Sequence, residues 1–377
     1  MDKRDYDIFL AKLEAEEARI NYKKYLDELM DKGEFKPLPF WRELLLDSYL
    51  LPTYYNAKRR YLYENGKLEN GKLLTGLGWR EKLHPALLGL MSLYRKYFNK
   101  QTIKVLNDRH TESDKPVIYA ITHIGMYDYQ IVSELIKKHQ IPFAGDPETL
   151  YRSGDGLLLA LNGLVYCDTE DKTDRKIAAE TAKEVLNTGH NLLIYPEGVW
   201  NVTPNLLMLP LYPGIIRMAK ETGCDIVPIA IEQYDKDFII NVGENFKVED
   251  LKFNDKEQEK EYVETKKRDL RDNMATLKWE IFESLPREER KNIGEYAKKH
   301  KEFVDTRFNE WFNKKENKPY YNPELVKHRT FKPKNIEFAE DVFSYLPKVK
   351  LNKNNAFMFG RDVIYPVDME EIRNKVR

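Results

Sequence analysis

His123 and Asp128 are the two side chains of this sequence best suited to proton transfer. They lie in "THIGMYDYQ", which follows "KPVIYAI", an apolar run typical of a buried strand. An imidazole can remove a proton at neutral pH, and a carboxylate that accepts its second N–H fixes the tautomer and stabilises the imidazolium. If a helix begins near Gly125, the histidine precedes it and the aspartate lies in its first turn, so we expect them to face each other.

The spacing of this pair is weak evidence by itself, because the chain contains it twice. "HKEFVD" places His300 and Asp305 at the same separation. That second pair lies in a stretch rich in lysine and glutamate with no strand before it, which is typical of a solvated surface. The first pair differs in its context, which is a buried strand followed by a turn with glycine.

A second stretch with chemical potential is "NLLIYPEGVWN". It brings Glu197 directly after an apolar strand, where a carboxylate is costly unless it is paired or reaches a site. Gly198 beside it allows the backbone to approach a ligand closely. An ordinary strand-to-loop turn with a solvated glutamate is the alternative, and the residues alone leave both open.

The elements that must position these residues lie between about 115 and 245. Apolar runs at 117–121, 163–167, 191–195, 225–231 and 237–242 alternate with helical patterns. This alternation predicts an α/β fold with a mostly parallel central sheet flanked by helices, and sites in such sheets lie beyond the carboxyl ends of the strands. With helical N- and C-terminal extensions, the predicted domains are 1–80, 81–285 and 286–377.

The flanking segments are expected to be helical and polar. Residues 1–32 predict a solvated helix that ends near Gly33, and 255–318 predict long exposed helices. Residues 83–98 predict a helix with an apolar face, for which two interpretations stay open: packing against the core, or contact with a membrane. That face consists of Leu83, Leu87, Leu90, Tyr94 and Tyr97.

Composition excludes several classes of protein. Lys+Arg and Asp+Glu both number 62 and are mixed along the chain, so we expect no nucleic-acid partner. Cys167 and Cys224 are too few for a disulfide framework, and no spacing of metal ligands occurs. No apolar run is long enough to span a membrane, and the first residues lack a signal-peptide pattern. We therefore expect a cytoplasmic protein, with peripheral contact at the inner face of the membrane as an option.

The motifs together resemble the glycerolipid acyltransferase family of the lysophosphatidic acid acyltransferase type. Its four blocks occur in order: His123 with Asp128, "NGLVYCDT" at 162–169, "YPEGVWN" at 195–201, and "IVPIAI" at 226–231. The match covers about 110–245. Ordered blocks at plausible separations are more specific than any one of them.

The resemblance implies transfer of a fatty acyl group from acyl-CoA or acyl-carrier protein to a hydroxyl (or amine) of a lipid, sugar or other alcohol. His123 is then the general base and Asp128 its orienting acid. The thioester is a co-substrate, so no cofactor or metal is implied. Phospholipid biosynthesis is the implied setting. The residues placed around the acceptor are Glu197, Gly198, Trp200, Asn201 and Thr169.

Two positions depart from the family pattern. Arginines associated with the acceptor's phosphate usually occur where this chain has Thr169 and Trp200. Neither side chain can replace the charge of a guanidinium, which binds phosphate bidentately. Either other cations such as Arg152, Lys172 or Arg175 bind the phosphate, or the acceptor carries none there. The second interpretation is favoured, so the acceptor need not be a glycerol phosphate.

Other functions are less well supported by the sequence. A non-catalytic lipid-binding or scaffolding protein of the same fold is the main alternative, and the intact His123–Asp128 pair argues against it. A hydrolase is disfavoured because the Gly-x-Ser-x-Gly motif is absent. A nucleotide-binding protein is disfavoured because neither glycine-rich phosphate loop occurs.

Overall fold

The computed structural model describes most of the chain as far as Ser284, in two compact units. The described residues are 18, 20–39, 42, 45–46, 50–66, 73–74, 76–124, 127–144, 158–159, 161–168, 171–198, 207–234, 237–253 and 255–284. Unit 1 comprises Met1–Leu87 and His139–Leu192, and unit 2 comprises Leu88–Lys138 and Leu193–Arg377. The predicted C-terminal extension, 286–377, lies outside the described residues, and the predicted domain boundaries stay predictions.

Unit 2 contains the strands that lead to the candidate site. They are β1 (Thr102–Asp108), β2 (Ile118–Ile121), β6 (Ile226–Tyr234) and β7 (Asp237–Val242), in the spatial order β1-β7-β6-β2. β2 pairs with β6 in parallel, β1 pairs with β7 in parallel, and β6 and β7 are antiparallel neighbours. Every residue of β2 is buried, as its β-branched and apolar composition predicts.

Unit 1 contains β3 (Gln140–Ala144) and β4 (Val165–Tyr166), which pair in parallel. β5 (Asn191–Ile194) contributes two residues to each unit, and the seven strands belong to one mixed sheet. The predicted mostly parallel α/β fold is thus confirmed. The sequence missed β1 and β3 but predicted the other five strands.

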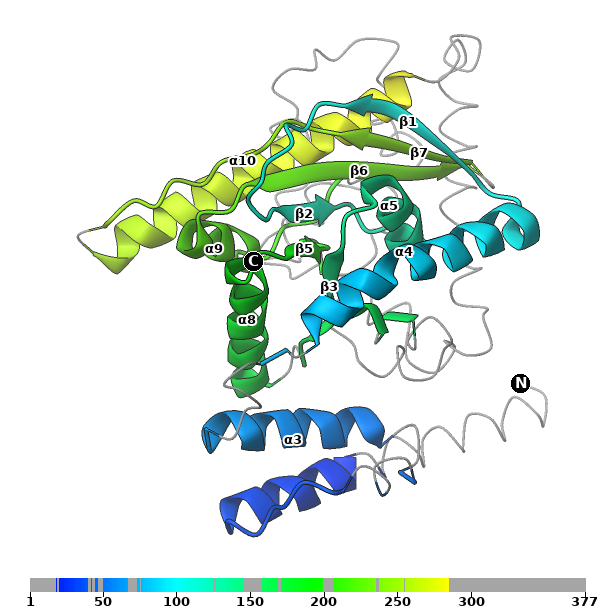
Figure 1. Ribbon diagram of the computed structural model, residues 1–377. Helices are drawn as coiled ribbons and strands as arrows, with labels where there is room; N and C mark the ends of the chain where they lie inside the picture. The colour runs from blue at the N-terminus through cyan, green and yellow to red at the C-terminus, as the bar shows by residue number, and fades with distance from the viewer. Residues whose placement is uncertain are drawn as a thin grey trace, which may run out of the picture. The chain divides into compact units, whose positions relative to one another are not determined.

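The sheet of unit 2 is covered by a helix on each face (Figure 1). Successive side chains of a strand point to opposite faces. Ile229 and Ile231 of β6 belong to a core cluster with α5 (Asp128–Ile136). Ala230 between them packs with α10 (Lys256–Glu283). α9 (Gly214–Thr222) also contacts α10 and ends at Gly223 in the left-handed conformation, φ +66°.

The helix predicted after residue 255 is present as α10, but the expectation that it is exposed is wrong for one face. α10 packs against β6 and β7, and its regularly spaced apolar side chains are covered. The spacing of apolar residues indicates that one face of the helix is buried, and in this fold that face packs against the sheet. The buried positions are Leu270, Met274, Leu277 and Ile281.

Unit 1 has its own small core among its helices. Residues 20–31 are helical, and the helix is followed by Gly33 with φ +67°, near the predicted end. Leu26 of this segment is buried with Tyr54 of α3 (Leu51–Glu64), so the helix is only partly solvated. α3 contacts α8 (Lys172–Asn187), which in turn contacts β4.

The apolar face predicted for 83–98 divides into two parts. α4 (Leu77–Leu93) continues into a π-helical segment, η2 (Tyr94–Asn99). Leu87 is buried, in keeping with packing against the core. Leu90, Tyr94 and Tyr97 are 57%, 51% and 72% exposed, so the core does not account for that end of the face.

Candidate active site

The end of β2 brings His123 to the start of α5. Thr122 prolongs the pairing with β6, because its Oγ1 accepts the N–H of Ile231 at 3.0 Å. His123 Nδ1 then lies 3.0 Å from Oδ2 of Asp128, the first residue of α5. The same Oδ2 accepts the N–H of Ile124 at 2.6 Å. The carboxylate therefore holds both the imidazole and the backbone beside it.

This contact assigns the ring nitrogen of His123 that carries the proton. An ionised carboxylate can only accept, so Nδ1 must carry the proton that Asp128 receives. Nε2 is then the basic nitrogen. The side chain of Asp128 is 1% exposed, whereas that of His123 is 21% exposed. The acid is thus enclosed while the base reaches the surface of unit 2.

Tyr195 is a site residue that the sequence reasoning missed. Its ring stacks on the imidazole of His123 with centroids 4.0 Å apart and planes 21° from parallel. Stacking restricts rotation of the imidazole, and an aromatic face also favours an imidazolium. The available signal was its position as the first residue of the block "YPEGVWN".

Glu197 points into unit 2 and binds backbone. One carboxylate oxygen accepts the N–H of His123 at 3.2 Å, and the other accepts the N–H of Leu209 at 2.8 Å. The residue is only 2% exposed. Burial raises its pKa to about 7, which Lys278 and the two N–H groups oppose and Asp128 reinforces. The solvated-glutamate alternative is therefore excluded.

Gly198 is required by the local backbone. It has φ +72°, and a Cβ there would lie 2.4 Å from the ring of Tyr212. Its N–H donates to the carbonyl of Tyr195 at 2.9 Å, which closes a turn around Glu197. This turn directs the glutamate inward immediately after β5.

The comparison with protein families matches residues 102–232 to the family described as Acyltransferase. Residues 102–232 are therefore called the acyltransferase domain, after the family that they resemble. Among solved structures, the chain is similar to the 1-acyl-sn-glycerophosphate (LPA) acyltransferase PlsC from Thermotoga maritima. The identity is 16%, the alignment covers 65% of this chain and 98% of that one, and the TM-score is 0.40. The comparison with curated proteins finds no match.

Three residues predicted around the acceptor of this acyltransferase domain lie outside the described residues: Thr169, Trp200 and Asn201. Their roles stay predictions. Of the substitute cations considered, Arg152 also lies outside them, while Lys172 and Arg175 are exposed on α8. The family assignment does not test the role of any single residue.

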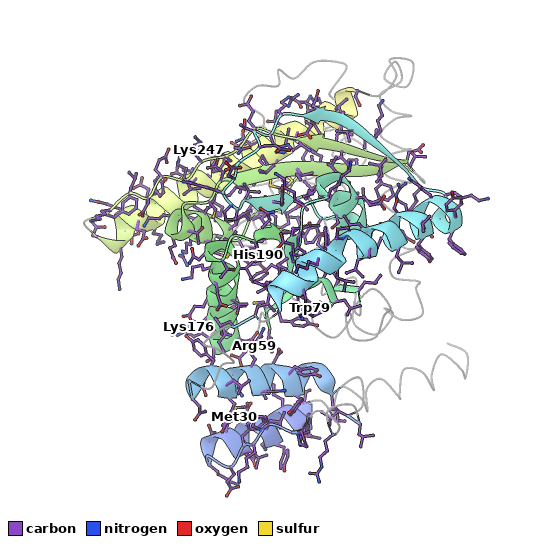
Figure 2. The ribbon with its side chains drawn as sticks, viewed as in Figure 1. Met30, Arg59, Trp79, Lys176, His190 and Lys247 are labelled. Atoms are coloured by element: carbon purple, nitrogen blue, oxygen red, sulfur yellow. The ribbon has the colours of Figure 1, made fainter. Side chains whose placement is uncertain are left out.

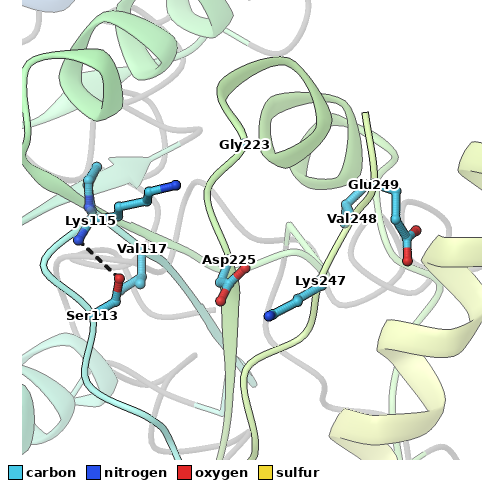
Figure 3. A pocket seen from close by; sticks show the side chains of 9 residues that line it. Ser113, Lys115, Val117, Gly223, Asp225, Lys247, Val248 and Glu249 are labelled. Atoms are coloured by element: carbon cyan, nitrogen blue, oxygen red, sulfur yellow. Dashed lines mark hydrogen bonds between the residues drawn. The ribbon is translucent and has the colours of Figure 1, made fainter. Parts of the chain in front are cut away.

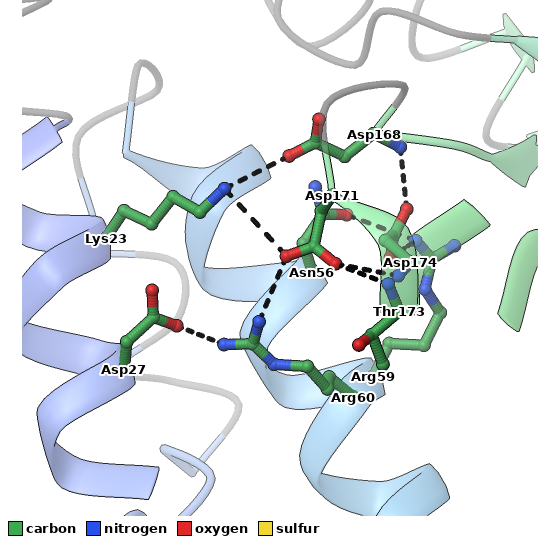
Figure 4. Close-up of polar contacts among 9 residues, drawn as sticks. All are labelled: Lys23, Asp27, Asn56, Arg59, Arg60, Asp168, Asp171, Thr173 and Asp174. Carbon is green, nitrogen blue, oxygen red and sulfur yellow. Dashed lines mark hydrogen bonds and ion pairs between the residues drawn. The ribbon is translucent and has the colours of Figure 1, made fainter. Parts of the chain in front are cut away.

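The second block of the domain, in unit 1, is surrounded by ion pairs (Figure 4). Arg59 of α3 pairs with Asp174 and donates to the carbonyl of Tyr166 at 3.0 Å. Asp174 also accepts the N–H of Asp168 at 2.6 Å. Among the described residues, the ion pairs here join Lys23, Arg59 and Arg60 to Asp27, Asp168, Asp171 and Asp174.

A buried ion pair lies at the boundary of the acyltransferase domain. Lys278 Nζ on α10 is 2.8 Å from Oε1 of Glu232 on β6, and the side chains are 5% and 2% exposed. Glu232 is the last residue of the family match, so Lys278 comes from outside it. The lysine also acts electrostatically on Glu197.

A separate cavity of about 450 Å³ lies at the opposite end of the parallel strands of unit 2 (Figure 3). Val117 and Asp225 in its lining directly precede β2 and β6. Lys115 and Lys247 also line it. Because His123 follows the carboxyl end of β2, this cavity is not part of the site built around it.

Two kinds of feature are absent from the part of the chain that the structure describes. No three histidine, cysteine, aspartate or glutamate side chains gather there as a metal site requires. None of the helices in that part is both long and apolar enough to cross a bilayer.

Proposed function

We propose that this acyltransferase moves a fatty acyl group from acyl-CoA or acyl-carrier protein to a hydroxyl (or amine) of its acceptor. His123 Nε2 takes the acceptor's proton, and the acceptor oxygen attacks the thioester carbonyl. The carbon–sulfur bond then breaks, and the leaving thiolate receives the proton from the imidazolium. The observation that supports this most directly is the 3.0 Å contact of Nδ1 with the buried Asp128, since it leaves the exposed side of the ring to act as the base.

The oxyanion formed in this reaction needs hydrogen-bond donors. The backbone N–H groups of His123 and Ile124 are already bound by Glu197 and Asp128. We therefore expect the donors to come from another part of the chain.

We infer that the acceptor carries no phosphate at the second block. A phosphate dianion needs an excess of positive charge. Among the described residues, Lys23, Arg59 and Arg60 are instead engaged in ion pairs with carboxylates, whereas Lys172 and Arg175 are exposed on α8. This observation concerns the second block by itself, and it agrees with the missing arginine at Thr169.

We also infer peripheral contact with a membrane through the exposed end of the α4–η2 segment. This end of the segment has two leucines, Leu90 and Leu93, and three aromatic side chains, and all five are at least half exposed. Aromatic residues at such positions favour the bilayer interface, and nearby lysines favour anionic lipids. The aromatic residues are Tyr94, Tyr97 and Phe98, and the lysines are Lys96 and Lys100.

The α4–η2 segment is bound to α5, the helix that begins with Asp128, by an ion pair and a hydrogen bond. Arg95 of η2 is buried and pairs with Glu134 of α5 at 2.9 Å. Gln130 of α5 donates to the carbonyl of Met91 at 2.6 Å. A lipid acceptor that enters from the membrane would thus meet the helix on which the catalytic pair is built.

The test is a transfer assay with the purified full chain. Acyl-CoA is offered with lysophosphatidic acid and with a panel of non-phosphorylated alcohols, and we expect turnover with a preference for the latter. Preference for the phosphate acceptor would refute the argument about the second block. Absence of any transfer or acyl-CoA hydrolysis would favour the non-catalytic lipid-binding alternative.

Substitution of the base tests the assignment within the site. His123→Ala should lower kcat by at least about 100-fold, the usual contribution of a general base. His300→Ala, in the second match to the same spacing, is the matched control and should retain full turnover. Equal activity of the two variants would overturn the assignment of His123.

A further inference from the structure

Glu197 uses both of its carboxylate oxygens inside the protein. Oε1 accepts the backbone N–H of His123 at 3.2 Å, and Oε2 accepts the backbone N–H of Leu209 at 2.8 Å. The residue is 2% exposed. A carboxylate committed in this way has neither the surface nor the orientation to bind an acceptor, although its position in the third block suggested that role.

A buried carboxylate needs a compensating charge, because burial disfavours its ionised form. The charged groups that act electrostatically on Glu197 are Lys278 from α10, which favours ionisation, and Asp128 from α5, which opposes it. Lys278 is held in place by its 2.8 Å pair with Glu232 of β6. The compensating charge thus comes from a helix outside the acyltransferase domain.

We propose that Glu197 is a positioning residue that holds the backbone of His123 in place for acyl transfer, and that Lys278 supplies the positive charge that its ionised carboxylate requires. The inference rests on the proposed function, since it assigns a role within that same site. A protonated Glu197 would present a hydroxyl to one of the two N–H donors and lose that hydrogen bond. The ionised form is therefore the one that fixes His123.

The position of His123 matters because Asp128 and Tyr195 orient its ring only if the backbone is correctly placed. A shift of about 1 Å in a reacting group can lower the rate about 100-fold. Loss of the Glu197 contact should therefore appear in kcat, whereas loss of an acceptor-binding group would appear in KM.

The first experiment is a steady-state comparison of Glu197→Gln with the wild type. Glutamine keeps the size of the side chain but turns an NH2 group toward one of the two donors. We expect kcat to fall about 100-fold, with the KM for the acceptor unchanged. Glu249→Gln, at a carboxylate of the surface paired with Lys266, is the control and should behave as wild type. A raised KM with unchanged kcat would overturn the proposal.

The second experiment tests Lys278 through the pH profile of kcat. Lys278→Met removes the cation, so the acid limb should move to higher pH, whereas Lys278→Arg keeps the charge and should leave it in place. Lys266→Met on the same helix should also leave it in place. If Lys278→Met fails to fold, the paired variant Lys278→Met/Glu232→Gln removes the cation without stranding Glu232 and should shift the limb in the same direction. An unmoved acid limb would overturn the role of Lys278.

A third experiment separates this inference from the proposed function, because it needs no activity. The unfolded chain releases the Glu197 proton near its ordinary value of 4.5, whereas the folded protein keeps it to about pH 7. The free energy of unfolding should therefore fall as pH rises between these values, and Glu197→Gln should remove that part of the slope.

The outcomes distinguish the two claims. If the free energy of unfolding depended on pH equally in the wild type and in Glu197→Gln, the proposal that Glu197 is a buried, ionisable positioning residue would be overturned. A steeper slope in the wild type, together with no acyl transfer, would refute the proposed function and leave the structural role of Glu197 in place.

Discussion

At the scale of single residues, His123 is restrained from three directions. Asp128 binds its Nδ1, the Tyr195 ring stacks on its face, and Glu197 binds its backbone N–H. Each contact removes a different freedom: the tautomer, the rotation of the ring, and the position of the main chain. A general base needs all three, because proton transfer depends on distance and direction as well as on basicity.

Asp128→Asn tests the tautomer. In the wild type, Oδ2 of Asp128 accepts hydrogen bonds from both His123 Nδ1 and the Ile124 N–H. The asparagine amide can still accept a hydrogen bond, but it has no negative charge to favour the tautomer of His123 that is protonated at Nδ1. We expect kcat to fall by about 10²–10⁴-fold, with the circular dichroism spectrum unchanged. Asp305→Asn, at the corresponding position of the second match, should have wild-type kcat. An Asp128→Asn variant as active as this control would contradict the assignment.

At the scale of elements, the site is formed by the loop residues that directly follow the strands. β2 ends two residues before His123, and α5 begins with Asp128, so one strand–helix connection supplies both partners. β5 ends just before Tyr195 and the turn that carries Glu197. In unit 1, the start of α8 is held to α3 by the Arg59–Asp174 pair.

Arg59→Met should destabilise unit 1, because it leaves the carboxylate of Asp174, which is 4% exposed, without its cation. We expect a loss of about 3 kcal/mol in the free energy of unfolding, as is typical when a buried pair loses one member. Lys176→Met is a matched control, since Lys176 is exposed and pairs with Glu180 only at 4.0 Å; it should change stability by less than about 1 kcal/mol. Figure 2 shows both side chains. Urea denaturation of the two variants measures the difference, and equal losses would argue against the pair.

At the scale of the whole molecule, large apolar side chains of the described residues form the cores of the two units, but those at the end of α4 and in η2 are exposed. An exposed stripe of this kind usually marks a binding surface. The Arg95–Glu134 pair connects it to α5, so the proposed membrane surface and the proposed catalytic pair are linked within unit 2.

Phe98→Glu tests this surface by sedimentation with vesicles that contain anionic lipid. Phe98 is 76% exposed, and a charge there should reduce membrane partitioning roughly tenfold. Leu251→Glu is the control, because Leu251 is also exposed, at 47%, but lies outside the stripe. Equal binding of the two variants would rule out the stripe as the contact.

The local patterns of the sequence predicted much of the fold but not all of it. β2 and β5 were recognisable because buried strands have continuous apolar sequences. β1 was missed because it mixes Thr102, Lys104 and Asp108 with its apolar residues, a pattern that local propensity does not separate from a loop. The covered face of α10 was missed because spacing does not reveal what a helix packs against.

The candidate site divides in the same way. The sequence alone predicted the resemblance to acyltransferases and the contact of His123 with Asp128, because a strand, a short turn and a helix place neighbours in the chain close together in space. Only the tertiary structure decided that Tyr195 stacks on the imidazole, that Glu197 turns inward, and that Lys278 from α10 acts electrostatically on Glu197. These contacts join segments far apart in the chain, and burial, which sets their energies, exists only once those segments are packed together.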